Sequence, residues 1–177
     1  ELAAASGNEW GVLTGCRKSS VLQALAESES AASREIDRLT ALFGHDNVYI
    51  ELTDQGNPRD TVRNDALAAL ASKHRLPLLA TNNVHYATPP QARLHAAVAA
   101  VRANRSMEDL DGWLPSTGGA FLRSGVEMTA RFQRYPGAVA NTVTLADELA
   151  FPLRRARPAL PQQEVPPGHT PMSWLRH

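Results

Sequence analysis

An asparagine and a histidine, two positions apart, follow a short apolar run near the middle of the chain. Asn83 and His85 come after the run at 76–81. If the extended conformation continues through them, their side chains leave the backbone on the same face. Imidazole nitrogen is a good ligand for Zn or Mn, whereas an asparagine amide is a weak and uncharged one. The spacing therefore indicates a metal or phosphate site, with a turn held by Asn82 and Asn83 as the alternative.

Two more side chains that could take part in chemistry lie at or near the ends of apolar runs. Cys16, the only cysteine, follows the run at 10–14. A lone cysteine is usually an inert buried thiol, but a place after a strand favours a ligand role. Glu51 lies inside the run at 48–52, where a carboxylate is costly unless it is paired. We expect it to face a barrel mouth or to bond a neighbouring loop. The remaining histidines are expected to be solvated: residues 45, 74, 95, 169 and 177.

The first half of the chain alternates strand and helix patterns. Strands are expected at 10–14, 48–52 and 76–81. The helices between them are expected at 20–26, 30–43 and 59–74. This order predicts an α/β fold with parallel strands, whose carboxyl ends meet at one rim. Three strands cannot close a barrel, so we expect part of a distorted β/α barrel or a small open sheet.

The second half has a helical pattern and then a proline-rich one. Helices are expected at 89–104, 126–134 and 137–149, and Leu94, Val98 and Val101 would line one face of the first. Prolines then cluster between residues 152 and 171, which is typical of a semi-rigid linker. We therefore divide the chain into an α/β part (1–88), a helical connector (89–150) and a Pro-rich linker (151–177).

The composition of the chain limits the classes of protein to which it can belong. The chain has 177 residues, 43% of them hydrophobic, and a formal net charge of zero. A sizeable core is therefore possible, and a surface that coats nucleic acid nonspecifically is not indicated. A single cysteine allows no internal disulfide and favours a reducing compartment such as the cytoplasm. No apolar run has the length of a membrane span.

Four segments together resemble the bacterial family C DNA polymerases, the α-subunit type of polymerase III. They are residues 13–18 (LTGCRK), 48–52 (VYIEL), 79–86 (LATNNVHY) and 122–128 (LRSGVEM). The sequences of these segments are most similar to those of the error-prone branch, which acts in damage-induced translesion synthesis. The tail at 160–175 resembles the run that leads from the N-terminal domain into the polymerase core.

The resemblance implies a metal-binding PHP domain, the polymerase and histidinol phosphatase module. Cys16 and His85 match the family's cysteine ligand and its last histidine ligand. Asn83 stands where the family commonly has aspartate, and Glu51 would at most contact a ligand. The other metal ligands are expected before the first residue, and the palm carboxylates after the last. The segment should therefore contain no catalytic residues and show no polymerase activity alone.

For the parent protein, the resemblance implies DNA and deoxynucleoside triphosphates as partners, with replication or repair accessory proteins. Mg would serve the polymerase core, and Zn or Mn the PHP site. Two alternatives remain open. One is a stand-alone PHP-type metallophosphoesterase. The other is a non-catalytic interaction module that uses the basic residues Arg154, Arg155 and Arg157.

Overall fold

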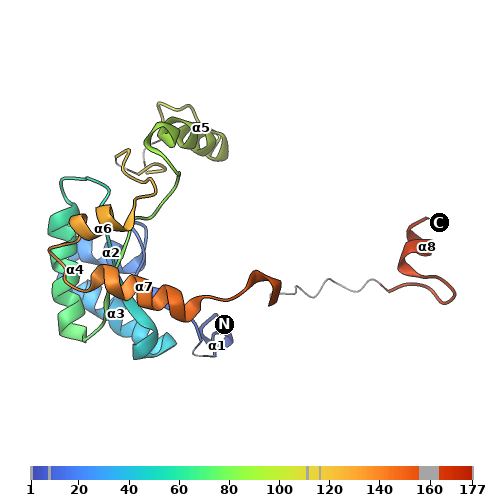
Figure 1. Ribbon diagram of the computed structural model, residues 1–177, viewed down its shortest axis with the longest axis horizontal. Helices are drawn as coiled ribbons and strands as arrows, with labels where there is room; N and C mark the ends of the chain where they lie inside the picture. The colour runs from blue at the N-terminus through green and yellow to red at the C-terminus, as the bar shows by residue number, and fades with distance from the viewer. Residues whose placement is uncertain (1, 8, 111, 116, 156–163, 177) are drawn as a thin grey trace. The chain divides into compact units, whose positions relative to one another are not determined.

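The computed structural model describes residues 2–7, 9–110, 112–115, 117–155 and 164–176 (Figure 1). The chain divides into two compact units, Glu1–Asp147 and Glu148–His177. The predicted boundaries at residues 88 and 150 are finer than this division and stay predictions.

A small parallel sheet forms the centre of the first unit. Its strands are β1 (Val12–Leu13), β2 (Val48–Thr53) and β3 (Leu78–Thr81), in the spatial order β1-β2-β3. The register pairs Val12 with Val48, and Ile50 with Leu78. The described sheet is open rather than closed into a barrel. The predicted α/β fold with parallel strands is confirmed, although β1 is shorter than the apolar run at 10–14.

Helices join the strands, as parallel strands require. Between β1 and β2 lie α2 (Ser20–Glu27), α3 (Glu29–Phe43) and the short 3₁₀ helix η1 (His45–Asn47). Between β2 and β3 lies α4 (Asp60–His74), and α1 (Leu2–Ala5) precedes the sheet. Local signals fix these boundaries. The Ser19 and Ser28 side chains accept hydrogen bonds from first-turn amides of α2 and α3, and Gly44 ends α3 with a φ of 87°.

One hydrophobic core joins the sheet to helices from both halves of the chain. The strands contribute Val48, Ile50 and Leu52, which are fully buried, and α4 contributes Leu67 and Leu70. Three residues from the second half complete the same core: Phe132, Tyr135 and Ala138. The part of the chain from 128 to 139 therefore packs as part of the α/β unit.

The helix α7 (Ala138–Leu149) covers the outer edge of β3. The Thr142 hydroxyl accepts a hydrogen bond from the Ala80 amide at 3.0 Å and lies 3.1 Å from the Ala80 carbonyl. The Asn141 amide donates to the Leu78 carbonyl at 3.0 Å. Side chains of α7 thus satisfy backbone groups of a strand whose outer edge would otherwise be open to association with other strands.

A polar contact attaches the segment after α6 (Gly125–Arg131) to α4. The Arg134 guanidinium makes two hydrogen bonds of 2.8 Å to the Asp65 carboxylate, and the Tyr135 hydroxyl donates to the same carboxylate at 3.0 Å. Burial, assisted by Asp65, raises the pKa of Tyr135 to about 12, so its hydroxyl stays protonated and keeps donating. This arrangement is a charge-assisted clamp between segments 70 positions apart.

The helix α5 (Ala92–Ala103), which follows the 3₁₀ turn η2 (Pro89–Gln91), exposes its large apolar side chains. Leu94, Val98 and Val101 are 64%, 60% and 83% exposed, so they do not form a core-facing stripe. The inward positions hold small alanines, of which Ala100 is buried. Spacing predicted which residues share a face, but not that this face points outward.

The second unit contains η3 (Leu153–Arg155) and α8 (Pro171–Leu175). Arg154 and Arg155 are exposed there, whereas Arg157, Pro158 and Pro161 lie outside the described residues. The Pro-rich linker is therefore described only in part. Among the helices that the structure describes, none is long and apolar enough to cross a membrane.

Candidate functional site at the strand ends

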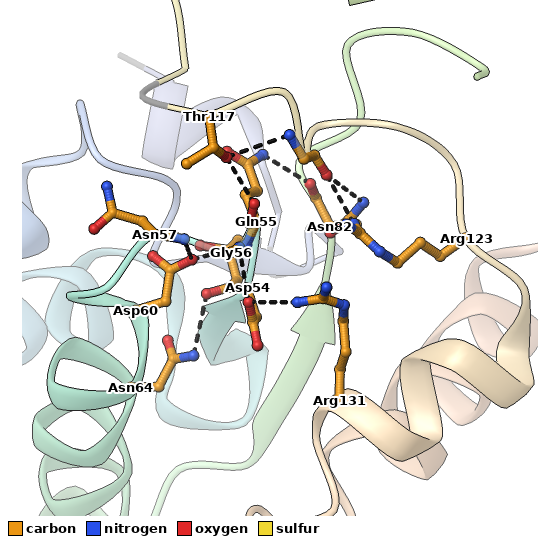
Figure 2. Close-up of polar contacts among 12 residues, drawn as sticks. Asp54, Gln55, Gly56, Asn57, Asp60, Asn64, Asn82, Thr117, Arg123 and Arg131 are labelled. Carbon is orange, nitrogen blue, oxygen red and sulfur yellow. Dashed lines mark hydrogen bonds and ion pairs between the residues drawn. The ribbon is translucent and has the colours of Figure 1, made fainter. Parts of the chain in front are cut away.

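The loops that leave the carboxyl ends of the strands carry most of the predicted site residues. Cys16 follows β1, and Asn83 and His85 follow β3, with β2 between these two strands. Neighbouring strands lie about 4.8 Å apart, so the β1 and β3 loops leave the sheet roughly two strand spacings from each other. Figure 2 shows the polar contacts of the rim that follows β2 and β3.

Asp60, at the start of α4, organises the loop after β2. It is 4% exposed, and one carboxylate oxygen accepts backbone hydrogen bonds from Gln55 at 2.8 Å and Asn57 at 3.0 Å. The other oxygen accepts from the Arg63 guanidinium at 2.6 Å. A buried carboxylate is costly unless paired, and here amides and a cation satisfy it. Asp60 therefore shapes this loop and is engaged with the protein itself (Figure 2).

Asn82 connects the end of β3 to the segment before α6. It is 6% exposed, and its carbonyl oxygen accepts from the Arg123 guanidinium at 2.7 Å. Its amide donates to the carbonyls of Gly119 and Phe121, and Arg123 also donates to Gly119 at 2.7 Å. Figure 2 shows Asn82 and Arg123 facing each other. This buried, fully used amide fixes where the loop after β3 runs.

Gln55 joins the loops after β2 and β3. Its side-chain amide donates to the backbone carbonyls of Asn82 at 2.9 Å and Asn83 at 3.1 Å. Its own carbonyl accepts from the Thr117 hydroxyl at 2.6 Å. One residue earlier, the Asp54 carboxylate accepts from Arg131 of α6 at 2.7 Å. The rim is thus tied to the connector by a network that sequence reasoning missed.

His85 is placed by the backbone. Its amide donates to the Ala120 carbonyl at 2.9 Å, and Tyr86 forms an isolated parallel bridge with Phe121. The imidazole is exposed. Its Nδ1 lies 3.2 Å from Nε2 of His95, and the two ring centroids are 4.9 Å apart.

The electrostatics of this corner favour the neutral form of His85. Loss of hydration on its packed side lowers the pKa of His85, and its interactions with His95, Arg17 and Lys18 lower it further. Neutral imidazole is the form that binds a metal ion. His95, which we expected to be solvated, is half-buried and packs against His85 and Tyr86.

Asn83 does not continue the strand. β3 ends at Thr81, and Asn83 has a φ of 43°, in the left-handed region that asparagine tolerates better than most residues. The expectation that Asn83 and His85 leave one extended face is therefore wrong. The turn alternative describes the backbone better, because the Asn83 carbonyl is held by Gln55.

Cys16 carries a free, partly exposed thiol in the loop after β1. Its carbonyl accepts from the Ser19 amide at 2.8 Å, and Gly15 before it has a φ of 85°. The neighbouring Arg17 donates to the carbonyls of Gly112 and Leu114, both at 3.0 Å. Cys16 is thus presented on a tight turn whose next residue is anchored to the 112–115 loop.

Glu51 bonds across the sheet. Its carboxylate accepts a hydrogen bond from the Thr81 hydroxyl of β3, and its backbone amide donates to the Thr14 hydroxyl at 2.9 Å. It is half-buried, and its neighbours Ile50 and Leu52 are fully buried on the opposite face. The pairing that a strand carboxylate needs thus comes from a neighbouring strand.

The donor set fits a metal ion only in part. Over the residues that the structure describes, no group of three or more His, Cys, Asp and Glu side chains converges. His85 has a second imidazole beside it, whereas Cys16 stands after a different strand. The assignment of Cys16, His85 and Asn83 as ligands stays a prediction, and a complete site would need donors from elsewhere.

Known proteins match this chain over almost its whole length. It is 52% identical over 176 residues to an error-prone DNA polymerase of Cutibacterium acnes. It is 47% identical to that of Nocardia farcinica over 182 residues and 46% identical to that of Mycobacterium tuberculosis over 176. Each match covers 99% of the chain but only 16% of the relative. No protein-family model matches.

Along almost its whole length the chain is similar to part of the error-prone DNA polymerases, the name its relatives carry. The matches support its resemblance to the bacterial family C DNA polymerases, close to the error-prone branch. The open parallel sheet is consistent with a partial PHP-like α/β fold.

Proposed function

We propose that this chain is the C-terminal part of the PHP domain and the connector into the catalytic core of an error-prone DNA polymerase, with a structural role. The observation that carries the proposal is the identity of 46–52% over 99% of the chain to proteins of that name. In the proposal, the full protein extends DNA with deoxynucleoside triphosphates during damage-induced translesion synthesis in the bacterial cytoplasm. Carboxylates outside this chain would hold Mg for that reaction. Replication or repair accessory proteins would assist it.

The packing supports a scaffold role. α7 bonds to the edge of β3, and the buried Phe132 and Tyr135 share a core with the sheet. The hydrogen bond between Arg123 and Asn82 fixes the loop after β3. A domain that must hold its position while a neighbouring core binds DNA needs such cross-connections, since loosely joined domains move by default.

We further propose that Cys16 and His85 contribute to a Zn or Mn site completed by other parts of the full protein. The free thiol and the neutral imidazole are suitable donors. Asn83 would be a weak ligand. In a full-length protein, Asn83→Asp should raise metal affinity, because aspartate tolerates the same backbone conformation and adds a charge. Unchanged affinity would mean that the Asn83 side chain points away from the ion.

A chimera tests the main proposal. This chain would replace the matching segment of the Cutibacterium acnes polymerase, and primer extension would be measured on undamaged and lesion-bearing templates. The proposal predicts that the chimera extends both templates and that the 177-residue chain alone extends neither. A soluble, folded chimera without activity, or activity of the chain alone, would contradict it.

A further inference from the structure

Two histidines from different elements meet at the rim through ring nitrogens. His85 lies in the loop after β3 and His95 lies on α5. Nδ1 of His85 and Nε2 of His95 are 3.2 Å apart. At this distance either one ring donates its N–H to the nitrogen of the other, or both nitrogens bind the same metal ion.

The spacing of the nitrogens suits a metal ion. Zn–N bonds are about 2.0–2.1 Å long, so two nitrogens on one tetrahedral Zn²⁺ are roughly 3.3–3.4 Å apart. The observed 3.2 Å requires only a small change to reach that value. The rings meet edge to face, with an interplanar angle of 73°.

Backbone hydrogen bonds hold the segments that carry both histidines. The His85 amide is bonded to Ala120, and α5 begins after a capping box in which the Gln91 side chain accepts from the Thr88 amide at 3.0 Å. The His95 ring also packs on Tyr86, with centroids 5.5 Å apart. A pair held from both sides loses less conformational entropy on binding an ion than two mobile side chains would.

We propose that His85 and His95 bind a divalent transition-metal ion as a two-histidine chelate. His95 is outside the ligand set that the family resemblance implies. The inference rests on the proposed function only in that His85 is a ligand in both. Arg17 and Lys18 bring positive charge to this corner, which weakens binding of a cation. Water or an anion would fill the remaining coordination positions.

The test uses the untagged 177-residue chain and Co²⁺. Visible absorption of Co²⁺ and isothermal titration would report coordination and affinity, with circular dichroism as the check on folding. We expect one Co²⁺ per chain, and a loss of affinity of at least ~10-fold in both His85→Ala and His95→Ala. His95→Gln, which keeps a polar side chain on α5, should show the same loss. His45→Ala is the matched control and should bind like the unmodified chain, and Mg²⁺ should not compete, because it prefers oxygen ligands.

The outcomes separate this inference from the proposed function. Binding that weakens in Cys16→Ser but not in the folded His95 variants would overturn the chelate and leave the family-type site standing. No Co²⁺ binding by the chain would also overturn it and would leave a shared proton as the link between the rings. Neither result would affect the primer-extension activity of the chimera.

Discussion

At the scale of single residues, two adjacent glycines differ sharply in their surroundings. A Cβ atom on Gly119 would lie 1.8 Å from the Gln55 carbonyl oxygen, whereas one on Gly118 would meet no atom within 4 Å. The close approach is part of the contact between the 117–120 segment and the loop after β2. The atoms that a Cβ on Gly119 would meet are backbone atoms of Gln55, which cannot move aside as a flexible side chain would.

Gly119→Ala should therefore lower the free energy of unfolding by about 1–3 kcal/mol or more. Gly118→Ala should change it by no more than about 0.5 kcal/mol. Urea unfolding of the two variants and the unmodified chain measures both values. Equal stability of the two variants would show that Gly119 does not pack on Gln55.

His45 gives a pH-dependent prediction. Its Nε2 lies 2.9 Å from the His74 carbonyl and its Nδ1 lies 3.3 Å from Asp46. The hydrogen bond to His74 raises the pKa of His45, and Asp46 raises it further. A raised pKa stabilises the folded protein below the ordinary value near 6.5, and this stabilisation is lost as pH rises through the folded value. His45→Ala should thus cost more stability at pH 5.5 than at pH 8.5, in paired denaturation curves. An equal loss of stability in His45→Ala at pH 5.5 and at pH 8.5 would contradict this prediction.

Several residue positions could be predicted from the sequence, and several contacts could not. Apolar runs predict strands, so Cys16 and His85 were expected after strands, where they lie. The left-handed backbone of Asn83 was missed, because asparagine permits that conformation without requiring it. The His85–His95 contact depends on where α5 lies relative to β3, which local spacing does not determine.

At the scale of elements, one hydroxyl of α7 supplies the hydrogen-bond partner of the Ala80 amide in β3. The Thr142 hydroxyl accepts from the Ala80 amide at 3.0 Å on the outer edge of the sheet. Its single proton can go to the Ala138 carbonyl of its own helix at 2.9 Å or to the Ala80 carbonyl at 3.1 Å. Thr144, two positions further on, is exposed and bonds to the Ala140 carbonyl of its own helix. The same substitution at the two sites therefore separates an edge contact from a local one.

Thr142→Val should lower the free energy of unfolding by about 1–3 kcal/mol, because it leaves the Ala80 amide without its partner. Thr144→Val should stay within about 0.5 kcal/mol of the unmodified chain. Thermal and urea unfolding measure both, and hydrogen exchange of the Ala80 amide should accelerate only in the first variant. Equal effects would show that the edge of β3 does not depend on Thr142.

Helix boundaries were predicted better than helix faces. Ser124 and Glu127 form a capping box at the start of α6, with Ser124 accepting from the Glu127 amide at 3.2 Å. Capping is local and therefore visible in the sequence. The outward face of α5, on which Val101 is 83% exposed, depends on tertiary packing. Periodicity alone cannot say which side of a helix meets the core.

At the scale of the whole molecule, the sheet, α4 and the α6–α7 segment share one hydrophobic core. Their shared core contains Phe132 and Tyr135, and the network around Asn82 ties the rim to the connector. The α/β class and its parallel strands could be predicted, because strand and helix patterns alternate. That the connector packs into the same core could not, because the contacts span more than 60 residues of chain.

The central claim is that this segment supports the polymerase rather than taking part in nucleotide addition. The most direct measurement is the Gly119→Ala variant of the chimera, compared with Gly118→Ala. A scaffold role predicts that Gly119→Ala shortens the half-life of activity at elevated temperature, while the extension rate per active enzyme at 25 °C stays unchanged. A fall in the rate per active enzyme with an unchanged half-life would contradict the claim.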